Sequence, residues 1–386
     1  MLNATTIQLI KSTVPVLAEH GPAITRVFYQ RLFERHPEMT HIFNQTNQKT
    51  NRQSQALAHA VYAAAANIDQ LDVLKPTLLP VLHKHRSLQI KPEMYPIVGT
   101  ELLRAIEEVL GDAATPAIID AWGLAYQEIA DLFMTLEAEL YAQDEQAKGF
   151  TGYQTFTVTA ITEEASDIKS FTLQPTHALT LPAFTPGQYV TLRIKTPAGL
   201  WQNRQYSLIN RPGDAFYTIA VKRDGSVSKQ LHDATNIGDT VLLSAPAGTF
   251  ALPTGQAPVV LFAGGIGLTP LLAIADAALA ASRSVTLYVA IQDDRDRAFS
   301  TRLASLETAG ATVIRYAERH AQTGTTSGRL TEEVIQNVDK SAIAFVCGPE
   351  AMIRFVASNW QGATEQLHYE VFGPVLAFEA EAVGAN

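Results

Sequence analysis

The sequence predicts a multidomain protein in which an all-α first third is followed by an antiparallel β-barrel and then by an α/β domain with a parallel sheet. Apolar residues recur at helical spacing over about residues 3–142. From Tyr153 the period changes to two, and beyond Pro258 short apolar strands alternate with helix-like segments. The corresponding domains are residues 1–146, 150–255 and 256–386.

Length and composition agree with this division. The chain has 386 residues, and at roughly 100–200 residues per domain this length gives two or three domains. Hydrophobic residues make up 47% and charged residues 17%, which argues against disorder. The net charge of -9 lacks the basic excess that binds nucleic acid, so we expect no nucleic-acid partner.

The sequence also limits the compartment and the kinds of metal site. Cys347 is the single cysteine, which excludes intramolecular disulfides, thiolate zinc sites and protein-ligated iron–sulfur clusters. The N-terminus has no basic leader before an apolar run. The most apolar stretch, 258–281, is interrupted by glycines, Pro270 and Asp276, so a buried strand and helix explain it better than a membrane span. We expect a cytoplasmic protein without stable membrane insertion, and a monomer.

The first third contains three apolar stripes with helical spacing. Thr5 or Thr6 is expected to cap the first helix, and Gly21-Pro22 and Pro37 are expected to mark the next turns. The stripes consist of Ile7, Ile10, Val14 and Leu17; of Ile24, Val27, Phe28 and Leu32; and of Leu102, Ala105, Ile106 and Val109.

His85 is the candidate metal-ligating histidine of this region. On a helix over about residues 77–88, His85 lies in the apolar stripe that Leu78, Val81, Leu82 and Leu88 form. His83 lies off the stripe and is interpreted as a partly solvated side chain. A lone histidine on an apolar face is more often an ordinary core residue, and the stripe itself does not decide between the two interpretations.

The β-rich middle third carries a short polar motif, Arg204-Gln205-Tyr206-Ser207. In a β-domain this motif resembles the flavin motif of the ferredoxin reductase superfamily, in which a cation meets the pyrophosphate and an aromatic residue and a hydroxyl meet the isoalloxazine. Tyr189, on an earlier strand, fits the same site. Three more residues, Gly225, Val227 and Ser228, lie in a segment that suits a phosphate. The expected strands include 156–160, 189–193, 217–221 and 241–243.

In the last third, a glycine turn follows an apolar strand at residues 259–262 and opens a helix. A turn in this position lets backbone amides and a helix N-terminus approach a pyrophosphate. Thr269 and Pro270 distinguish it from the Rossmann glycine pattern. Cys347, Gly348 and Pro349 follow a later strand at 343–346; the superfamily places the cysteine near the nicotinamide, although a buried structural cysteine is the commoner case. The turn consists of Gly264, Gly265, Ile266, Gly267, Leu268, Thr269 and Pro270.

Taken together, these motifs resemble the flavohaemoglobin family over essentially the whole chain. The resemblance implies haem b, FAD and NAD(P)H as cofactors, with His85 as the proximal iron ligand. It places Tyr95 and Glu137 in a hydrogen-bonded relay behind that histidine. On the distal side it places Tyr29 and Gln53 as donors to bound oxygen, with Phe43 and Leu57 lining the pocket. From the residues alone, Tyr29 and Leu57 equally suit ordinary core, and Glu137 suits a solvated helix face.

The C-terminal segment resembles the family segment that returns to the flavin. Phe372 is expected to cover the isoalloxazine, and Glu370 and Lys84 are expected between flavin and haem, although both equally suit solvated surface charges. The remaining members of the segment are Val371, Gly373 and Pro374.

The family's activity is nitric oxide dioxygenation, in which NAD(P)H electrons pass through FAD to haem and nitric oxide reacts with oxygen to give nitrate. The residues themselves indicate a haem that binds oxygen and is reduced by NAD(P)H through a flavin. Three alternatives stay open: an oxygen carrier or sensor, a flavin reductase without haem, and an alkyl or lipid hydroperoxide reductase. The preference between NADH and NADPH is not determined by the sequence.

Overall fold

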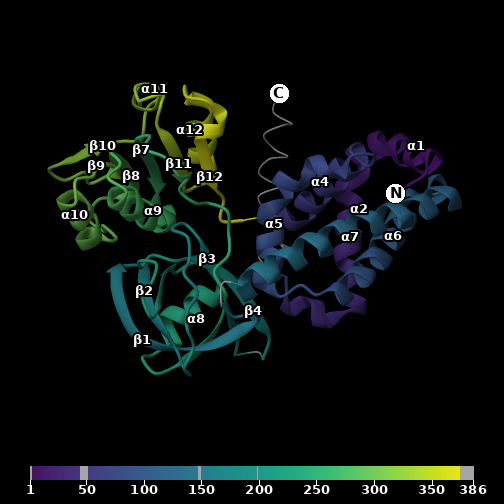
Figure 1. Ribbon diagram of the computed structural model, residues 1–386, viewed down its shortest axis with the longest axis horizontal. Helices are drawn as coiled ribbons and strands as arrows, with labels where there is room; N and C mark the ends of the chain where they lie inside the picture. Colours follow the sequence, from purple (N-terminus) through teal and green to yellow (C-terminus); the bar gives the residue numbers. More distant parts are fainter. Residues whose placement is uncertain (1, 44–50, 147–148, 198, 374–386) are drawn as a thin grey trace. The chain divides into compact units, whose positions relative to one another are not determined.

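The structure, a computed structural model, describes residues 2–43, 51–146, 149–197 and 199–373. The chain divides into two compact units (Figure 1). The first is built chiefly from residues 1–147, and the second from residues 148–196 and 204–372. The first unit is helical, and the second contains both sheets.

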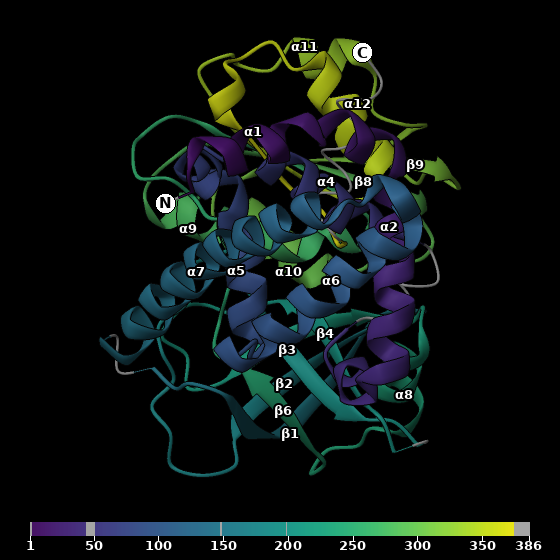
Figure 2. The same ribbon diagram turned by 90° about the vertical axis from the view of Figure 1, so that its right-hand side faces the viewer.

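The helical unit contains the predicted all-α region. Helix α2 packs against α4 and α6, and α5 packs against α7, which is visible in Figures 1 and 2. Its main buried cluster includes Phe28, Tyr29, Leu102 and Trp122. The elements are α1 (Ala4–Ser12), α2 (Val14–Arg35), η1 (Pro37–His41), α4 (Arg52–Ala66), η2 (Leu71–Leu74), α5 (Lys75–Leu88), η3 (Pro92–Met94), α6 (Tyr95–Leu110), η4 (Gly111–Ala113) and α7 (Pro116–Gln146).

Two details of the expected helix ends are wrong. The first helix is capped by Asn3, whose Oδ1 accepts from the Thr6 backbone N–H at 2.8 Å, instead of by Thr5 or Thr6. Pro22 lies inside α2 and does not end it. The helix continues because its buried face packs on α4, where Gly21 leaves room for the Ala58 methyl group.

The predicted stripe around His85 packs against two different helices. Leu78 and Leu82 belong to a buried cluster with Leu140 of α7. Val81 packs instead beside Ala56 of α4. Helix α5 therefore has α7 on one side of its apolar face and α4 on the other.

The middle third forms a six-stranded antiparallel sheet in the order β4-β3-β6-β1-β2-β5. A further bridge between Leu208, just after β4, and Ile219 of β5 joins the two edges and closes the sheet. The predicted antiparallel barrel is thus confirmed. The strands are β1 (Tyr153–Ala165), β2 (Ile168–Pro175), β3 (Tyr189–Lys195), β4 (Trp201–Ser207), β5 (Tyr217–Lys222) and β6 (Thr240–Ser244), with α8 (Ser226–Ala234) after β5.

The last third forms the predicted parallel sheet, in the order β10-β9-β8-β7-β11-β12. Strand β7 (Val259–Gly264) is buried throughout and lies between β8 (Val285–Asp293) and β11 (Ile343–Cys347). The chain crosses from one side of β7 to the other here, so the carboxyl ends of β7 and β11 form a topological switch point. The other elements are η5 (Gly265–Gly267), α9 (Leu268–Ala280), α10 (Ser300–Thr308), β9 (Thr312–Arg319), β10 (Thr325–Ser327), α11 (Glu332–Gln336), α12 (Glu350–Asn359), η6 (Thr364–Gln366) and β12 (Leu367–Glu370).

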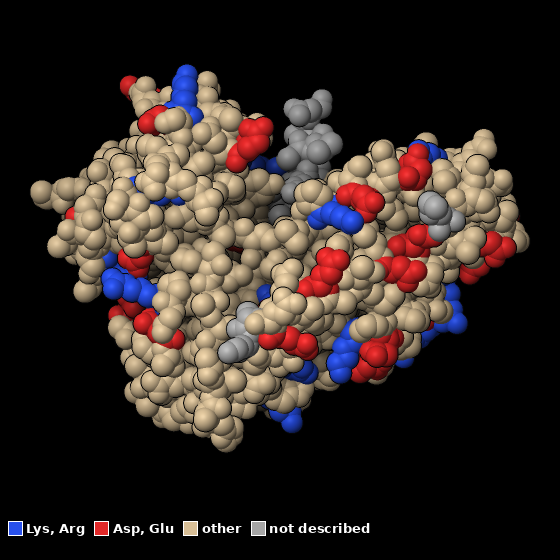
Figure 3. All heavy atoms as spheres, in the orientation of Figure 1, with Lys and Arg blue, Asp and Glu red and all other residues tan. Residues whose placement is uncertain are grey.

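The barrel and the parallel sheet share one buried core within the second unit. Ile168, Ala220 and Phe250 of the barrel belong to the same cluster as Leu271 and Ile274 of α9. None of the described helices is long and apolar enough to cross a membrane. Acidic and basic side chains are interspersed on the face of the helical unit that Figure 3 shows.

Candidate functional site

Two polar side chains from other helices, Glu137 and Tyr95, contact the imidazole of His85. Nδ1 of His85, on α5, lies 2.8 Å from Oε1 of Glu137 on α7. The Tyr95 hydroxyl, at the start of α6, donates to the same oxygen at 2.7 Å and lies 3.4 Å from Nδ1. Because a carboxylate can only accept, this arrangement places the ring proton on Nδ1. Among the described residues Nε2 has no hydrogen-bond partner, so its lone pair is available to a metal ion.

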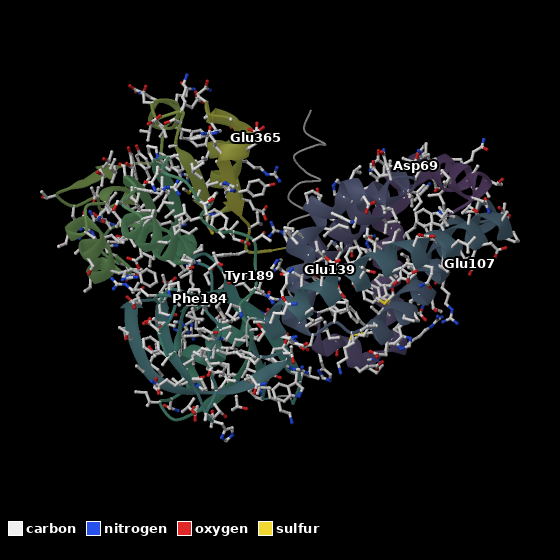
Figure 4. The ribbon with its side chains drawn as sticks, in the orientation of Figure 1. Asp69, Glu107, Glu139, Phe184, Tyr189 and Glu365 are labelled. Carbon is white, nitrogen blue, oxygen red and sulfur yellow. The ribbon has the colours of Figure 1, made fainter. Side chains whose placement is uncertain are left out.

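Glu137 is a buried carboxylate, with only 3% of its surface exposed. Glu139, two residues further along α7 and labelled in Figure 4, is exposed, as the helical period requires. The alternative interpretation of Glu137 as a solvated helix face therefore does not hold. Burial and the neighbouring Glu137 raise the pKa of the Tyr95 hydroxyl well above its usual range, so Tyr95 stays a proton donor.

Tyr126 supports Tyr95 from behind. Its hydroxyl donates to the Tyr95 carbonyl oxygen at 2.6 Å and accepts from the Gly99 backbone N–H. A Cβ atom at Gly99 would lie 2.4 Å from the Tyr126 ring, so only glycine lets the ring pass this turn of α6. Tyr126 was not predicted from the sequence, in which a glycine inside a helix, Gly99, is the local signal for it.

The residues expected on the distal side come together in the same unit. Tyr29 is 6% exposed, and its ring lies edge-on to Phe43 with centroids 5.5 Å apart. Leu57 packs against the same buried cluster, and Gln53 forms a side-chain hydrogen bond with Tyr29. Burial raises the pKa of Tyr29 well above its usual range, which keeps this phenol a hydrogen-bond donor.

The polar neighbours of His85 on α5 differ in how deeply they are buried. Lys84 and His83 are half-buried, and burial together with the nearby Arg86 lowers the pKa of His83 to about 4. Arg86 is buried and forms an ion pair with Asp144 of α7. This pair fixes the C-terminal turn of α5, which carries His85, against α7.

In the barrel, the Arg204 to Ser207 motif occupies the end of β4. Arg204 and Tyr206 are both half-buried, and burial lowers the pKa of Arg204 and raises that of Tyr206. Gln205 donates to the Thr191 hydroxyl at 3.2 Å, and Ser207 is buried. Tyr189, labelled in Figure 4, begins β3, the strand beside β4.

The segment expected to suit a phosphate begins helix α8, which the sequence analysis did not anticipate. Gly225 is the N-cap residue and leaves the helix N-terminus open. The Ser228 hydroxyl accepts from the Asp224 N–H at 2.9 Å and donates to the Gly225 carbonyl at 3.0 Å. Val227 is buried. The hydroxyl therefore shapes the turn, and the first backbone N–H groups of α8, which have no partner within the helix, are the part of the segment that suits an anion.

The glycine turn joins β7 to α9 at the switch point. Gly265 has φ +52°, and a Cβ atom at Gly267 would lie 2.3 Å from the Cys347 carbonyl oxygen. A Cβ atom at Gly348 would likewise lie 2.8 Å from the Cα of Gly264. The structure thus brings the two predicted segments, 264–270 and 347–349, into contact. Ile266 is half-buried, while Leu268, Thr269 and Pro270 are buried, so this turn offers backbone more than side chains to a ligand.

The C-terminal segment runs beside Cys347. Glu370 is the register partner of Cys347 in the β11–β12 pair, and burial together with Glu370 raises the pKa of the thiol well above its usual value. Pro349 is the N-cap residue of α12. Val371 is buried, Gly373 is half-buried, and Phe372 is 52% exposed. Pro374 lies outside the described residues.

Comparisons with known proteins agree with this arrangement. Residues 26–133 match the Globin family, residues 155–252 the oxidoreductase FAD-binding domain family and residues 261–358 the oxidoreductase NAD-binding domain family. A flavohemoprotein of Bacillus subtilis (strain 168) is 42% identical over 396 residues, which cover 98% of this chain and 99% of that protein.

Two solved structures are also similar. The crystal structure of flavohemoglobin from Malassezia yamatoensis with bound FAD and heme has a TM-score of 0.87 and 27% identity, and the match covers 96% of this chain and 100% of that chain. The FAD/NAD-binding domain of nitric oxide dioxygenase from Vibrio cholerae has a TM-score of 0.54 and 28% identity over 57% of this chain and 99% of that chain. With a globin domain joined to an FAD- and NAD-binding oxidoreductase module along its whole length, this chain belongs to the flavohemoprotein family.

Proposed function

We propose that this protein is a nitric oxide dioxygenase that binds haem b and FAD and uses NAD(P)H as its electron donor. Two molecules of nitric oxide and two of dioxygen take up the electron pair of one NAD(P)H, which leaves two nitrate ions, NAD(P)+ and one proton. The observation that carries the proposal is the Glu137 carboxylate, which is buried behind His85 and bonded to both His85 and Tyr95.

The residues present fit the three cofactors. His85 offers a free Nε2 to haem iron, the half-buried Arg204 cation suits the FAD pyrophosphate, and the backbone of Gly265 to Gly267 suits that of the nicotinamide nucleotide. When bound, the nucleotide supplies a hydride, the flavin divides the electron pair into single electrons, and the iron supplies the place where dioxygen meets nitric oxide.

Glu137 and Tyr95 set the state of His85. The carboxylate holds the ring proton at Nδ1 and makes Nε2 a stronger electron donor to the iron that it would bind. Tyr95 donates to the same carboxylate oxygen and limits the positions that Glu137 can adopt. A strongly donating histidine favours oxygen activation over reversible oxygen carriage, which distinguishes the proposal from an oxygen carrier or sensor.

Tyr29 and Gln53 act on the other side of the haem pocket. The Tyr29 phenol stays protonated because burial raises its pKa, so it offers a fixed O–H donor to a ligand that gains negative charge. The hydrogen bond with Gln53 orients that phenol. Phe43 and Leu57 exclude water around it.

The first test follows both halves of the electron path in the full protein. An anaerobic absorbance spectrum is recorded before and after NADH, and an oxygen-saturated pulse of nitric oxide follows. We expect reduction of a flavin band and a Soret band, then NADH-dependent loss of nitric oxide with nitrate as product. A protein without a Soret band after haem reconstitution would instead be a flavin reductase.

Hydroperoxides provide the comparison for the remaining alternative. The same holoprotein is assayed with NADH and an alkyl or lipid hydroperoxide in place of nitric oxide. Faster NADH oxidation with the hydroperoxide than with nitric oxide and oxygen would favour a hydroperoxide reductase and contradict the proposal.

A further inference from the structure

The segment that connects the barrel to the parallel sheet has no regular structure. Residues 251–257 lie between Phe250 and β7 and form neither helix nor strand. Within the described part of the chain, these residues make no backbone-to-backbone hydrogen bond. Gly255 has φ +136°. Because backbone hydrogen bonds do not fix the path of this segment, side chains that bind it add to the shared core in placing the barrel on the sheet.

Arg283 binds this segment at two points, Pro253 and Ala257. Its Nε donates to the Ala257 carbonyl oxygen at 2.7 Å, and its Nη1 donates to the Pro253 carbonyl oxygen at 3.0 Å. Arg283 is 4% exposed, and among the described residues it has no carboxylate partner. Its own backbone N–H bonds to the Ala278 carbonyl in the last turn of α9, so the cation lies near the negative end of that helix.

Burial of the Arg283 cation beside neutral partners carries a desolvation cost that an apolar side chain would not have. Desolvation of a charge costs more than burial of an apolar side chain of the same size, and it lowers the pKa of Arg283. What the guanidinium offers in return is a rigid plane with several donors, which can hold two carbonyls at a set separation. We therefore assign to Arg283 the role of fixing the backbone geometry of residues 253–257.

The barrel contacts the sheet at positions close to the expected nicotinamide site. Phe250 packs edge-on against Phe345 of β11 with ring centroids 5.2 Å apart, and Phe345 precedes Cys347 by two residues. A second contact lies after β8, where the Ser166 backbone N–H donates to Asp296 at 2.8 Å. Arg283 thus holds the connection between two modules whose contact extends to the end of β11.

We infer that Arg283 is a positioning residue for hydride transfer: by fixing residues 253–257 to the C-terminal end of α9, it sets the distance between the nicotinamide and the flavin. This role rests on the proposed function, because it requires that NAD(P)H reduce the flavin. Helix α9 (Figure 1) then links the two sites. Its N-terminus follows the glycine turn, and its C-terminus leads to Arg283.

The test measures flavin reduction in the holoprotein by stopped flow, with NADH and with NADH deuterated at the transferred position. In Arg283→Met we expect the limiting rate constant to fall about tenfold or more, because a displacement of about 1 Å between reacting atoms costs about 100-fold. The dissociation constant of NADH is expected to change by less than about threefold, since the glycine turn is untouched. In Arg283→Lys we expect an intermediate rate, because the ammonium group keeps the charge and lacks the planar fork.

Arg302→Met is the matched control. Arg302 forms an ion pair with Asp276 of α9 and, in the part of the chain that the structure describes, no hydrogen bond with residues 251–257. We expect this variant to melt at a lower temperature while it reduces the flavin at the wild-type limiting rate and with the wild-type isotope effect.

The outcomes separate the two proposals. If the Arg283 variants melt earlier but keep the wild-type limiting rate and isotope effect, Arg283 is only structural and the inference is overturned. If Arg283→Met does not fold, Arg283→Lys decides by the same rate and isotope effect. If neither NADH nor NADPH reduces the wild-type flavin, the proposed function fails, and the role of Arg283 fails with it.

Discussion

Nδ1 of His85 lies 2.8 Å from Oε1 of Glu137, although 52 residues separate the two in the sequence. The contact depends on the packing of α5 on α7, in which Leu78 and Leu82 meet Leu140 in one buried cluster. An apolar interface between two helices thus determines the hydrogen-bonded state of the imidazole.

Replacement of Glu137 by glutamine tests this relationship. The neutral amide oxygen of glutamine still accepts from Nδ1–H, but the negative charge is lost. The His85 imidazole then donates less electron density to the haem iron. We expect nitric oxide turnover to fall by about 10- to 100-fold and the haem midpoint potential to rise. Glu139→Gln, two residues away on the exposed face of α7, is the control and is expected to leave both unchanged. Equal turnover and potential in Glu137→Gln and the wild type would contradict the assigned role.

Two glycines in neighbouring helices give opposite predictions for stability. In Gly99→Ala the new methyl group meets the Tyr126 ring at 2.4 Å, and we expect a loss of about 1–3 kcal/mol in the free energy of unfolding. In Gly123→Ala the nearest atom is a Leu103 methyl carbon at 3.8 Å, so the better helix propensity of alanine stabilises α7 by roughly 0.5–1 kcal/mol. Chemical unfolding followed by circular dichroism measures both. Destabilisation of similar size in the two variants would show that the Tyr126 contact is not the cause.

His368 makes the stability of the second unit depend on pH. Its ring stacks on Phe345, and burial lowers its pKa below the ordinary value near 6.5. As the pH falls, His368 therefore takes up a proton more readily in the unfolded chain than in the folded one. Its contribution to the free energy of unfolding is fully present above about pH 6.5 and is lost as the pH drops toward the pKa of the folded protein. His368→Phe keeps the stacking, and we expect it to flatten this dependence.

Urea unfolding followed by flavin release, at several pH values between 5 and 7.5, measures the His368 effect. His177→Asn is the control, since His177 is exposed in the same unit. A decline with falling pH that is equally steep in His368→Phe and the wild type would assign the dependence to other groups.

Cys347 is expected to resist alkylation. The thiol is fully buried, and burial and Glu370 raise its pKa, so the folded chain presents almost no thiolate. Iodoacetamide at pH 8 should leave the mass of the native protein unchanged and add one adduct after unfolding, because the chain has one cysteine. Rapid modification of the native protein would mean that this end of β11 opens to solvent.

Periodicity predicted most of the fold because both sheets and the helical unit bury regular faces. The helix around His85 was expected over residues 77–88 and extends over Lys75–Leu88. Helix α8 and strands β2 and β4 were not among the expected elements: α8 has only nine residues, and β4 is rich in polar residues because it carries the Arg204 motif. In both cases tertiary context outweighs the local pattern.

The candidate site was predictable to the extent that it consists of local motifs. The glycine turn and the segment after Cys347 are such motifs, and their contact follows from the order of strands in the sheet. Tyr126 and Arg283 were out of reach, since each acts on a backbone carbonyl that lies far away in the sequence. No local pattern of residue types encodes such a partner.

The bridge between Leu208 and Ile219 has a consequence for handling the protein at high concentration. An open six-stranded sheet would present two rows of unpaired peptide groups, and such rows recruit strands from other chains. The bridge joins the edges at Leu208 and Ile219, so it occupies peptide groups where the two edges meet and limits the row that another chain could join. We therefore expect Ile209→Pro, which removes the Ile209 N–H bond to the Thr218 carbonyl beside the bridge and leaves the β2–β5 pairs in place, to cause aggregation before it causes a loss of activity.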